Sequence, residues 1–178
     1  MKYTILFSLL LVRTLTLSAQ ETFTRKDSLH GGLRFERTCF DVLHYDLNIK
    51  INPDNQSIMG YNDITFKTVE NTSKIQLDLF ENMQIDSIVF NAKKLSYKRE
   101  FEAVFVNFET AILKNSEQKI RFYYSGKPLA AKHAPWDGGF VWFKDSNGKD
   151  WVGVATQEPG SSLLYPVKDS KSDEPDFG

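Results

Sequence analysis

The sequence is short of cysteine, of charge imbalance and of long apolar runs. Cys39 stands alone among 178 residues, which excludes an internal disulfide and a four-cysteine zinc site. With 22 basic and 23 acidic residues the formal net charge is −1, so bulk charge gives no sign of a nucleic-acid partner. Beyond the first 19 residues no apolar run approaches the length of about 20 that spans a membrane, and no membrane span is expected.

Several catalytic signatures are also missing. The histidines His30, His44 and His133 are widely separated, and none belongs to the helical zinc motif H-E-x-x-H. The Gly138 and Gly139 pair lacks the Lys and Ser/Thr of a phosphate-binding loop, and the serines after Gly160 lack a G-x-S-x-G elbow. The residues by themselves therefore predict neither a catalytic group nor a metal site, and the histidines are interpreted as surface or satisfied core residues.

What the chain does have is apolar bulk sufficient for one domain. It is 41% hydrophobic and 13% aromatic, which excludes disorder as its main state. A length of 178 residues is that of one ordinary domain with short appendages. Cys39 is expected to be buried as a small apolar residue.

Residues 1–19 have the layout of a secretory signal peptide. A short basic start precedes the mostly apolar residues 5–12, and small residues lead to a cleavage site after Ala19. Arg13 interrupts the apolar run and Leu17 is bulky for its position, so a buried or interfacial helix is the alternative. The mature chain is accordingly expected to be secreted or periplasmic.

From Thr38 onward the hydrophobic pattern has a period of two. Residues 45–51 alternate apolar and polar side chains, as a strand with one buried face does. Comparable runs occupy 60–68, 75–79, 85–90, 103–108, 119–124, 140–143 and 151–154. Turn signals separate them by about 8–15 residues, which is typical of an antiparallel β-sandwich or open barrel. One turn of helix at 110–116 is the single expected exception.

The pattern divides the chain into three parts. Residues 1–19 are the signal peptide, 20–37 a polar leader or linker, and 38–178 an all-β domain. Within that domain, an Asn-Gly pair at 147–148 predicts a hairpin between two aromatic-rich strands. Residues 157–178 show no periodicity and form an irregular tail, which is expected to pack on something or to be incomplete.

Two groups of side chains are candidates for a site. The carboxylates of the tail, Asp169, Asp173 and Glu174, are interpreted as a solvated cluster, with acid–base catalysis or cation binding as the alternative. The three tryptophans are interpreted as core residues, with an exposed sugar-binding platform as the alternative; they are Trp136, Trp142 and Trp151.

Several short motifs follow one another in a fixed order along residues 39–178. They are Y-D-L at 45–47, G-x-x-x-I-x-F at 60–66, I-x-L-D-L at 75–79, G-G-F-V-W at 138–142, T-Q at 156–157, Y-P-V-K-D at 165–169 and D-E-P-D at 173–176. Each motif is weak evidence by itself, but the ordered series is specific. In this order they resemble the N-terminal domain of the aminopeptidase N family of zinc metallopeptidases, in its secreted bacterial type.

The resemblance implies a fold and a role. The family's N-terminal domain is an antiparallel, saddle-shaped β domain, described as a sandwich or open sheet, that covers one side of a helical zinc domain. The residue matching Gln157 helps to hold the N-terminal residue of a peptide substrate. An amide suits this task because it accepts or donates a hydrogen bond without a buried charge. Considered without the family, Gln157 is a strand-end surface residue.

The sequence also departs from the family. The G-x-M-E-N loop and the H-E-x-x-H helix are absent, while Tyr165 and Val167 stand where relatives often carry Trp and Cys. No cofactor is therefore expected in this chain, although zinc is expected in a full-length family member. The chain is interpreted as a domain truncated before its catalytic domain and inactive alone. Its partners would be that catalytic domain, in the same parent chain or another chain, and the substrate N-terminus.

Two other functions remain open at this point. One is a free-standing extracellular β-sandwich module that binds sugar or peptide through the tryptophans. The other is a minimal hydrolase that uses the tail carboxylates. The first predicts solvent-exposed indoles whose fluorescence shifts with ligand, and the second predicts activity that is lost when those carboxylates are changed.

Overall fold

The computed structural model describes residues 22–157, 159–170 and 172–178. The predicted signal peptide, residues 1–19, lies outside the described part of the chain. In that part no helix is long and apolar enough to cross a membrane.

The larger of the two main sheets has five strands. Its order is β1 (Phe40–Asn52), β2 (Ser57–Thr68), β8 (Glu117–Gly126), β4 (Met83–Phe90) and β5 (Lys93–Lys94), and every neighbouring pair is antiparallel. The predicted turn between the first two strands is present, where the Asn52 side chain accepts a 3.1 Å hydrogen bond from the Asp54 amide. That bond is the local signature of an Asx-type turn.

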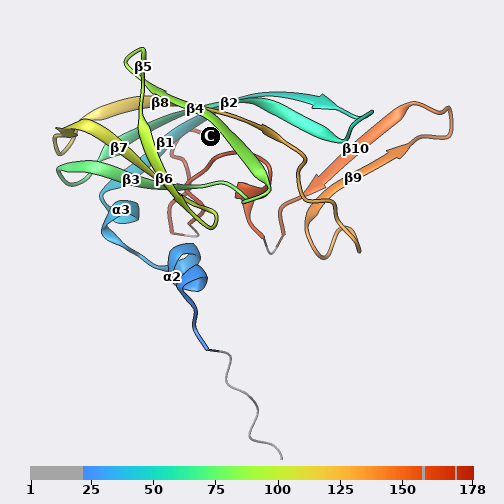
Figure 1. The fold of residues 1–178 in the computed structure, drawn as a ribbon, viewed down its shortest axis with the longest axis horizontal. Coiled ribbons are helices and arrows are strands. Elements are labelled where there is room, and N and C mark those ends of the chain that lie inside the picture. The colour runs from blue at the N-terminus through green and yellow to red at the C-terminus, as the bar shows by residue number, and fades with distance from the viewer. Residues whose placement is uncertain (1–21, 158, 171) are drawn as a thin grey trace, which may run out of the picture.

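A three-stranded antiparallel sheet packs against the larger one. It consists of β3 (Thr72–Asp78), β7 (Ala103–Ile112) and β6 (Ser96–Glu100), and Figure 1 shows it as a second layer. The core lies between the layers and includes Phe66 and Ile120 from one sheet and Leu77 and Val106 from the other. The all-β antiparallel prediction is confirmed, because alternating strands bury one face of each sheet.

The predicted hairpin forms a sheet of its own. It consists of β9 (Gly139–Lys144) and β10 (Asp150–Ala155), which extend away from the two main sheets at one end of the molecule (Figure 1). The Asp145 carboxylate closes the turn by accepting bonds from the Asn147 and Lys149 amides, at 2.8 and 2.9 Å. Gly148 takes a φ of 76° there, which glycine adopts without a steric penalty.

Two expectations about local structure differ from what is observed. The helical turn expected at 110–116 is wrong: β7 continues to Ile112, whose buried side chain keeps it in the sheet, and Asn115 turns the chain with a φ of 63°. The expected linker at 20–37 contains two short helices, α2 (Arg25–Gly31) and α3 (Phe35–Thr38). A capping box between Thr24 and Asp27 begins the first of them.

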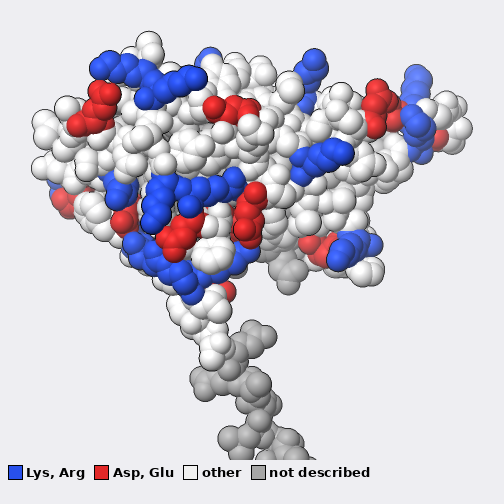
Figure 2. All heavy atoms as spheres, viewed as in Figure 1, with Lys and Arg blue, Asp and Glu red and all other residues white. Residues whose placement is uncertain are grey.

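The helix α2 is fastened to the three-stranded sheet by charge. Its ion pairs are Arg25–Glu100 at 2.8 Å, Lys26–Glu81 and Lys26–Glu102 at 3.1 Å, and His30–Glu102 at 3.7 Å. Figure 2 shows basic and acidic side chains side by side on this part of the surface. Leu29, which is 2% exposed, adds an apolar anchor against Ala103 and Phe105.

The irregular tail packs against the sandwich, as expected. It contains a short 3₁₀ helix, η1 (Ser161–Leu163), and Val167 forms an antiparallel bridge with Asp78. Its last residues lie beside the edge of β1, where Phe177 N donates to Leu43 O at 2.9 Å. Long-range backbone bonds, rather than any local period, give this segment its shape.

The charge on His30 should stabilise the docking of α2. The bond to Glu102 raises the pKa of His30 above its ordinary value of 6.5, so its stabilising contribution is complete below that value and is lost as pH rises through the folded pKa. We expect His30→Gln to lower the melting temperature at about pH 5.5 but not at about pH 8.5. The corresponding loss in the free energy of unfolding should be no more than about 1 kcal/mol, as for other exposed pairs. Thermal melts followed by circular dichroism measure this.

The exposed His44 provides the control. His44→Gln should leave the melting temperature unchanged at both pH values, because this side chain is exposed on β1. An equal loss of stability for His30→Gln at both pH values would contradict the role of the charge.

Candidate functional site

Gln157 lies two residues after the end of β10 and is exposed. Its backbone packs closely against Gly138, where an added Cβ would lie 2.6 Å from the Gln157 carbonyl oxygen and 2.6 Å from Pro159 Cδ. Gly138 also has a φ of 63°, so a side chain there would be both strained and obstructed. The loop before β9 and the turn after β10 therefore form one packed unit around Gln157.

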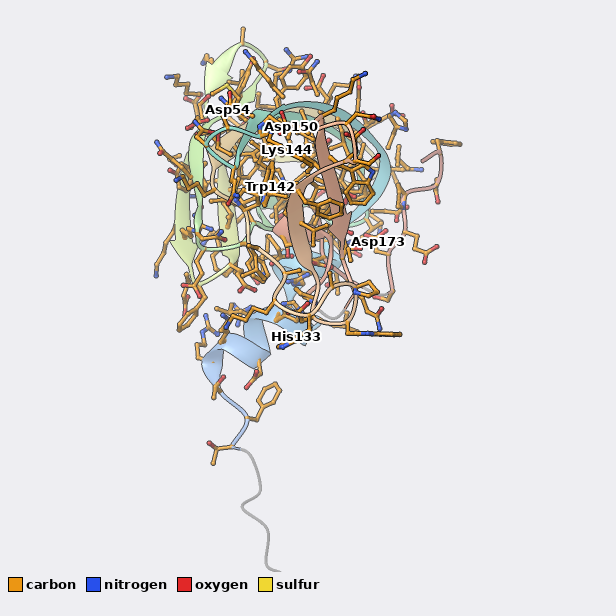
Figure 3. All side chains as sticks on the ribbon, turned by 90° about the vertical axis from the view of Figure 1, so that its right-hand side faces the viewer. Asp54, His133, Trp142, Lys144, Asp150 and Asp173 are labelled. Atoms are coloured by element: carbon orange, nitrogen blue, oxygen red, sulfur yellow. The ribbon has the colours of Figure 1, made fainter. Side chains whose placement is uncertain are left out.

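The loop before β9 is held by the side chain of Asp137. One carboxylate oxygen accepts bonds from the backbone amides of Lys132, at 2.7 Å, and His133, at 2.8 Å. Figure 3 shows His133 on this loop, at the opposite end of the hairpin from Lys144 and Asp150. Because the loop is tied at both ends, it presents Trp136, which is 72% exposed, from a fixed backbone.

The turn after β10 is held by the side chain of Asp169. Its carboxylate accepts bonds from the Ser162 hydroxyl, at 2.7 Å, and the Ser162 amide, at 3.2 Å. Gly160, with a φ of 89°, leaves room for this carboxylate, which an added Cβ would overlap. The Gly160 amide in turn donates to Thr156 O at 3.0 Å, which closes the turn that contains Gln157.

A buried ion pair lies behind Asp169. Arg37 and Asp78 are each 2% exposed, and the guanidinium donates to the carboxylate at 2.7 Å. Arg37 also donates to the Asp169 carbonyl and to the Leu29 carbonyl, both at 2.9 Å. The Asp169 amide donates to the other oxygen of Asp78 at 3.1 Å, and Gln76 adds a further 3.1 Å bond. This set of residues, Arg37, Gln76, Asp78 and the backbone of Leu29 and Asp169, is called the buried hub below.

Burial dominates the electrostatics of the hub. Loss of hydration raises the pKa of Asp78 to about 7, against the opposing effects of Arg37 and the hydrogen bonds from Gln76 and Asp169. Because the folded protein binds this proton more tightly than the unfolded chain, the contribution of Asp78 to stability is complete below its ordinary pKa of 3.8 and is lost as pH rises to about 7.

The tail carboxylates are not a solvated cluster, apart from Glu174, which is exposed. Asp169 belongs to the turn described above. Asp173 forms an ion pair with Lys168, whose ammonium is 6% exposed and also donates to Phe40 O at 2.6 Å. The expectation of solvation is therefore wrong for Asp169 and Asp173, because long-range contacts bury them. Their engagement in structural bonds gives no support to a minimal hydrolase.

The histidines lie on three separate elements. His30 ends α2, His44 is exposed on β1, and His133 lies on the loop before β9 with a side chain 84% exposed. Among the residues that the structure describes, no three His, Cys, Asp or Glu side chains are placed to hold a metal ion. Cys39 is fully buried, as predicted, and its thiol donates weakly to Lys74 O at 3.7 Å.

The tryptophans are less buried than predicted. Trp142 stacks on buried Phe140 at 5.3 Å and is partly buried, but Trp136 is 72% and Trp151 49% exposed. The core interpretation is wrong for these two, because Trp136 lies on the loop before β9 and Trp151 near the outer end of β10, and neither position is covered by another element of the described chain. Trp151 stacks on Phe143 at 4.3 Å, and an added Cβ on Gly153 would lie 2.9 Å from its indole.

A shallow cleft separates the hairpin from the turn between β1 and β2. Pro53 and Gln56 line one side, and Trp142, Lys144 and Asp150 line the other (Figure 3). Lys144 and Asp150 form a 2.7 Å ion pair across the hairpin. The volume is about 140 Å³, below the about 300 Å³ of an ordinary small-molecule site.

Apolar side chains on the inner faces remain uncovered at this end of the molecule. Leu47 is 40%, Ile51 45% and Val154 44% exposed. Their cross-strand partners include Ile58 and Phe140, which are buried on the same faces. Exposed apolar side chains are candidates for a contact surface where they are contiguous.

Sequence reasoning found Gln157 only through a family resemblance, and it missed the groups that hold the residue in place. Arg37 lies in a polar segment and carries no local signal, and Asp78 enters only as part of the I-x-L-D-L motif at 75–79, with no role assigned to it. The paired Gly138 and Gly139 were a usable signal, because adjacent glycines often mark a close backbone approach.

Comparison with known proteins finds the fold in solved structures only. No family model matches the chain, and no curated protein does. An M1 zinc metallopeptidase from Deinococcus radiodurans, solved with a Tyr-Ser-Ala substrate, superposes with a TM-score of 0.58 at 24% identity, over 75% of this chain and 30% of that protein. Yeast LTA4 hydrolase with bestatin gives a TM-score of 0.60 at 18% identity, over 76% of this chain and 21% of that protein.

These similarities show a shared fold. The chain spans less than a third of the length of the solved proteins that it matches. The fold prediction made from the ordered motifs is thus confirmed by solved M1 zinc metallopeptidases.

Breaking the buried ion pair should be costly. Arg37→Leu leaves the Asp78 carboxylate buried without its cation, and we expect a loss of about 3–5 kcal/mol in the free energy of unfolding. The double variant Arg37→Leu with Asp78→Asn should lose less, because no charge then stays buried. Urea unfolding measures both. Lys93→Ala, which breaks an exposed pair with Glu109, should cost at most about 1 kcal/mol.

Alanine substitution at Gly138 tests its close contact with Gln157, and the same substitution at Gly148 is the control. Gly138→Ala and Gly148→Ala both place alanine at positive φ, but only Gly138 has backbone within 4 Å of the new Cβ. Strain of about 1–3 kcal/mol should be common to the two variants. Gly138→Ala should destabilise more and should also shift the NMR signal of the Gln157 amide. Equal destabilisation, with no change at Gln157, would contradict the packing described above.

Proposed function

We propose that this chain is the N-terminal β domain of a secreted M1 zinc aminopeptidase and that it helps to bind the N-terminus of a peptide substrate. The observation that carries the proposal is the position of Gln157 at the end of the hairpin, where the segments before β9 and after β10 pack against the Gln157 backbone. The fold in which it lies is shared with M1 metallopeptidases. The ordered motifs at residues 39–178 support the same assignment.

Gln157 would act through its side-chain amide. The side chain is exposed while the backbone is packed, so the amide can reach a ligand from a fixed origin. Its carbonyl oxygen can accept a hydrogen bond from the free ammonium of a peptide. A neutral acceptor selects an N-terminal ammonium without the desolvation cost of a second charge.

The catalytic chemistry would come from a domain outside these residues. Zinc held there would polarise the scissile carbonyl and lower the pKa of a bound water. This chain would contribute the amide at Gln157 and an apolar contact surface that includes Leu47, Ile51 and Val154, whose exposure suits packing on another domain. By itself the chain should bind the substrate ammonium weakly and hydrolyse nothing.

A second candidate function rests on the stacked pair of Phe143 and Trp151. Both rings are about half exposed, and Gly153 leaves room for the indole. A flat aromatic surface of this kind suits the apolar face of a sugar ring. The tests below separate this alternative from the first.

Binding of an amine should be visible on the chain itself. We expect L-leucinamide to shift the NMR signals of the Gln157 side chain and of the Gly138 amide, whereas N-acetyl-leucinamide, which has no ammonium, should not. Gln157→Ala should weaken binding about tenfold or more, the usual value of a hydrogen bond to a charged group. Equal shifts from both compounds, or none at Gln157, would overturn the role of this residue.

Activity and sugar binding form the remaining tests. The chain should not cleave a fluorogenic amino-acid amide with or without added zinc, and zinc-dependent turnover abolished by a chelator would contradict the proposal. Saturable quenching of indole fluorescence by a panel of oligosaccharides, lost in Trp151→Ala and kept in Trp136→Ala, would favour the sugar-binding module instead.

A further inference from the structure

Gln157 is held from two sides, and only one of them belongs to its own hairpin. On the hairpin side Gly138 contacts its carbonyl oxygen. On the other side the bond from the Gly160 amide to Thr156 O, at 3.0 Å, fixes the turn in which it lies. The direction of the Gln157 side chain therefore depends on what holds Gly160.

Asp169 holds that turn. Its carboxylate receives both the hydroxyl and the amide of Ser162, at 2.7 and 3.2 Å, and it occupies the space that a side chain at Gly160 would fill. Two bonds to one carboxylate oxygen, together with a close contact on Gly160, leave the start of η1 little freedom. A shift of Asp169 would be passed to Gly160 and from there to Thr156 and Gln157.

The backbone of Asp169 is itself fixed by buried charge. Its carbonyl accepts from Arg37 at 2.9 Å and its amide donates to Asp78 at 3.1 Å. Arg37 belongs to α3, in the segment that precedes the β domain, and Asp78 ends β3. Both partners are 2% exposed, so solvent does not compete for these bonds.

We infer that Asp169 is a positioning residue for Gln157 and that the Arg37–Asp78 pair holds Asp169 in register. The inference rests on the proposed function of Gln157. It extends the substrate site from the hairpin to the helix α3, which is linked to Gln157 through Asp169, Ser162 and Gly160. The tail carboxylate that the sequence offered as an acid or base is assigned a structural task next to the site.

The variants are chosen to separate positioning from stability. Asp169→Ala removes the acceptor of both Ser162 bonds, and Asp169→Asn keeps an oxygen acceptor of the same shape. Asp173→Ala is the matched control: it removes another tail carboxylate, which forms an ion pair with Lys168 and has no hydrogen bond to Ser162. Ser162→Ala removes one of the two bonds and stays informative if Asp169→Ala does not fold.

Two measurements on the full chain give the outcome. In the first, without ligand, the heteronuclear NOE of the Gln157 amide should fall in Asp169→Ala, fall less in Ser162→Ala, and stay at the wild-type value in Asp169→Asn and Asp173→Ala. In the second, the affinity for L-leucinamide should drop about tenfold in Asp169→Ala, recover in Asp169→Asn, and be unaffected by Asp173→Ala even where its melting temperature falls.

The two readouts keep this inference apart from the proposed function. If Asp169→Ala and Ser162→Ala leave the Gln157 amide unchanged, the positioning role is overturned whatever the ligand does. If Asp173→Ala loosens Gln157 as much as Asp169→Ala, the effect is general loss of stability and the inference fails as well. If the wild-type chain does not bind L-leucinamide, the proposed function fails, and the first measurement still decides the positioning role.

Discussion

The ion pair between Arg37 and Asp78 lies where water does not reach, and the polar half of the molecule is arranged around it. Removing two charges from water carries a large desolvation cost, which additional hydrogen bonds to both ions offset. Not every polar atom of the hub is used, since Arg37 Nε and Gln76 Oε1 have no partner among the described residues. Here the guanidinium binds the carboxylate and two backbone carbonyls, while the carboxylate also receives an amide of the tail and the side chain of Gln76. The N-terminal helices, β3 and the tail are joined at one point.

The apolar core between the two sheets is formed differently, and it is the part of the structure that the sequence predicts. Side chains such as Ile64, Phe66 and Phe122 are buried because a strand turns every second residue to the same side, so their burial can be read locally. The helices at 25–38 and the tail after Gln157 have no such period. Their order depends on bonds such as the one between Asp78 and Asp169, which are 91 residues apart and leave no pattern along the chain.

The candidate site shows the same division. The hairpin was predicted from its Asn-Gly turn, because turn chemistry is local, and Gln157 entered through the resemblance of an ordered series of motifs. Trp136 and Trp151 were placed in the core because aromatic residues are buried on average. Trp136 instead lies on the loop before β9 and Trp151 near the outer end of β10, where average burial does not apply, and the two residues are 72% and 49% exposed.

The likeness to M1 metallopeptidases establishes an architecture, and a fold by itself does not carry a function. The feature that points beyond the fold is the packing around Gln157. Gly138 contacts its backbone on one side, and the Asp169 carboxylate holds the following turn on the other. Such support has a physical purpose only if the amide must be placed accurately for something else to react with its ligand, because a surface glutamine needs none of it. A metal site requires rigid, convergent ligands, and a weak neutral acceptor requires a rigid backbone. If a zinc-bearing domain supplied the metal ligands and a β domain supplied the rigid backbone for the amide, each domain would meet one of these two requirements. Under the proposed function, the anchored turn around Gln157 would be the contribution of this chain to that division.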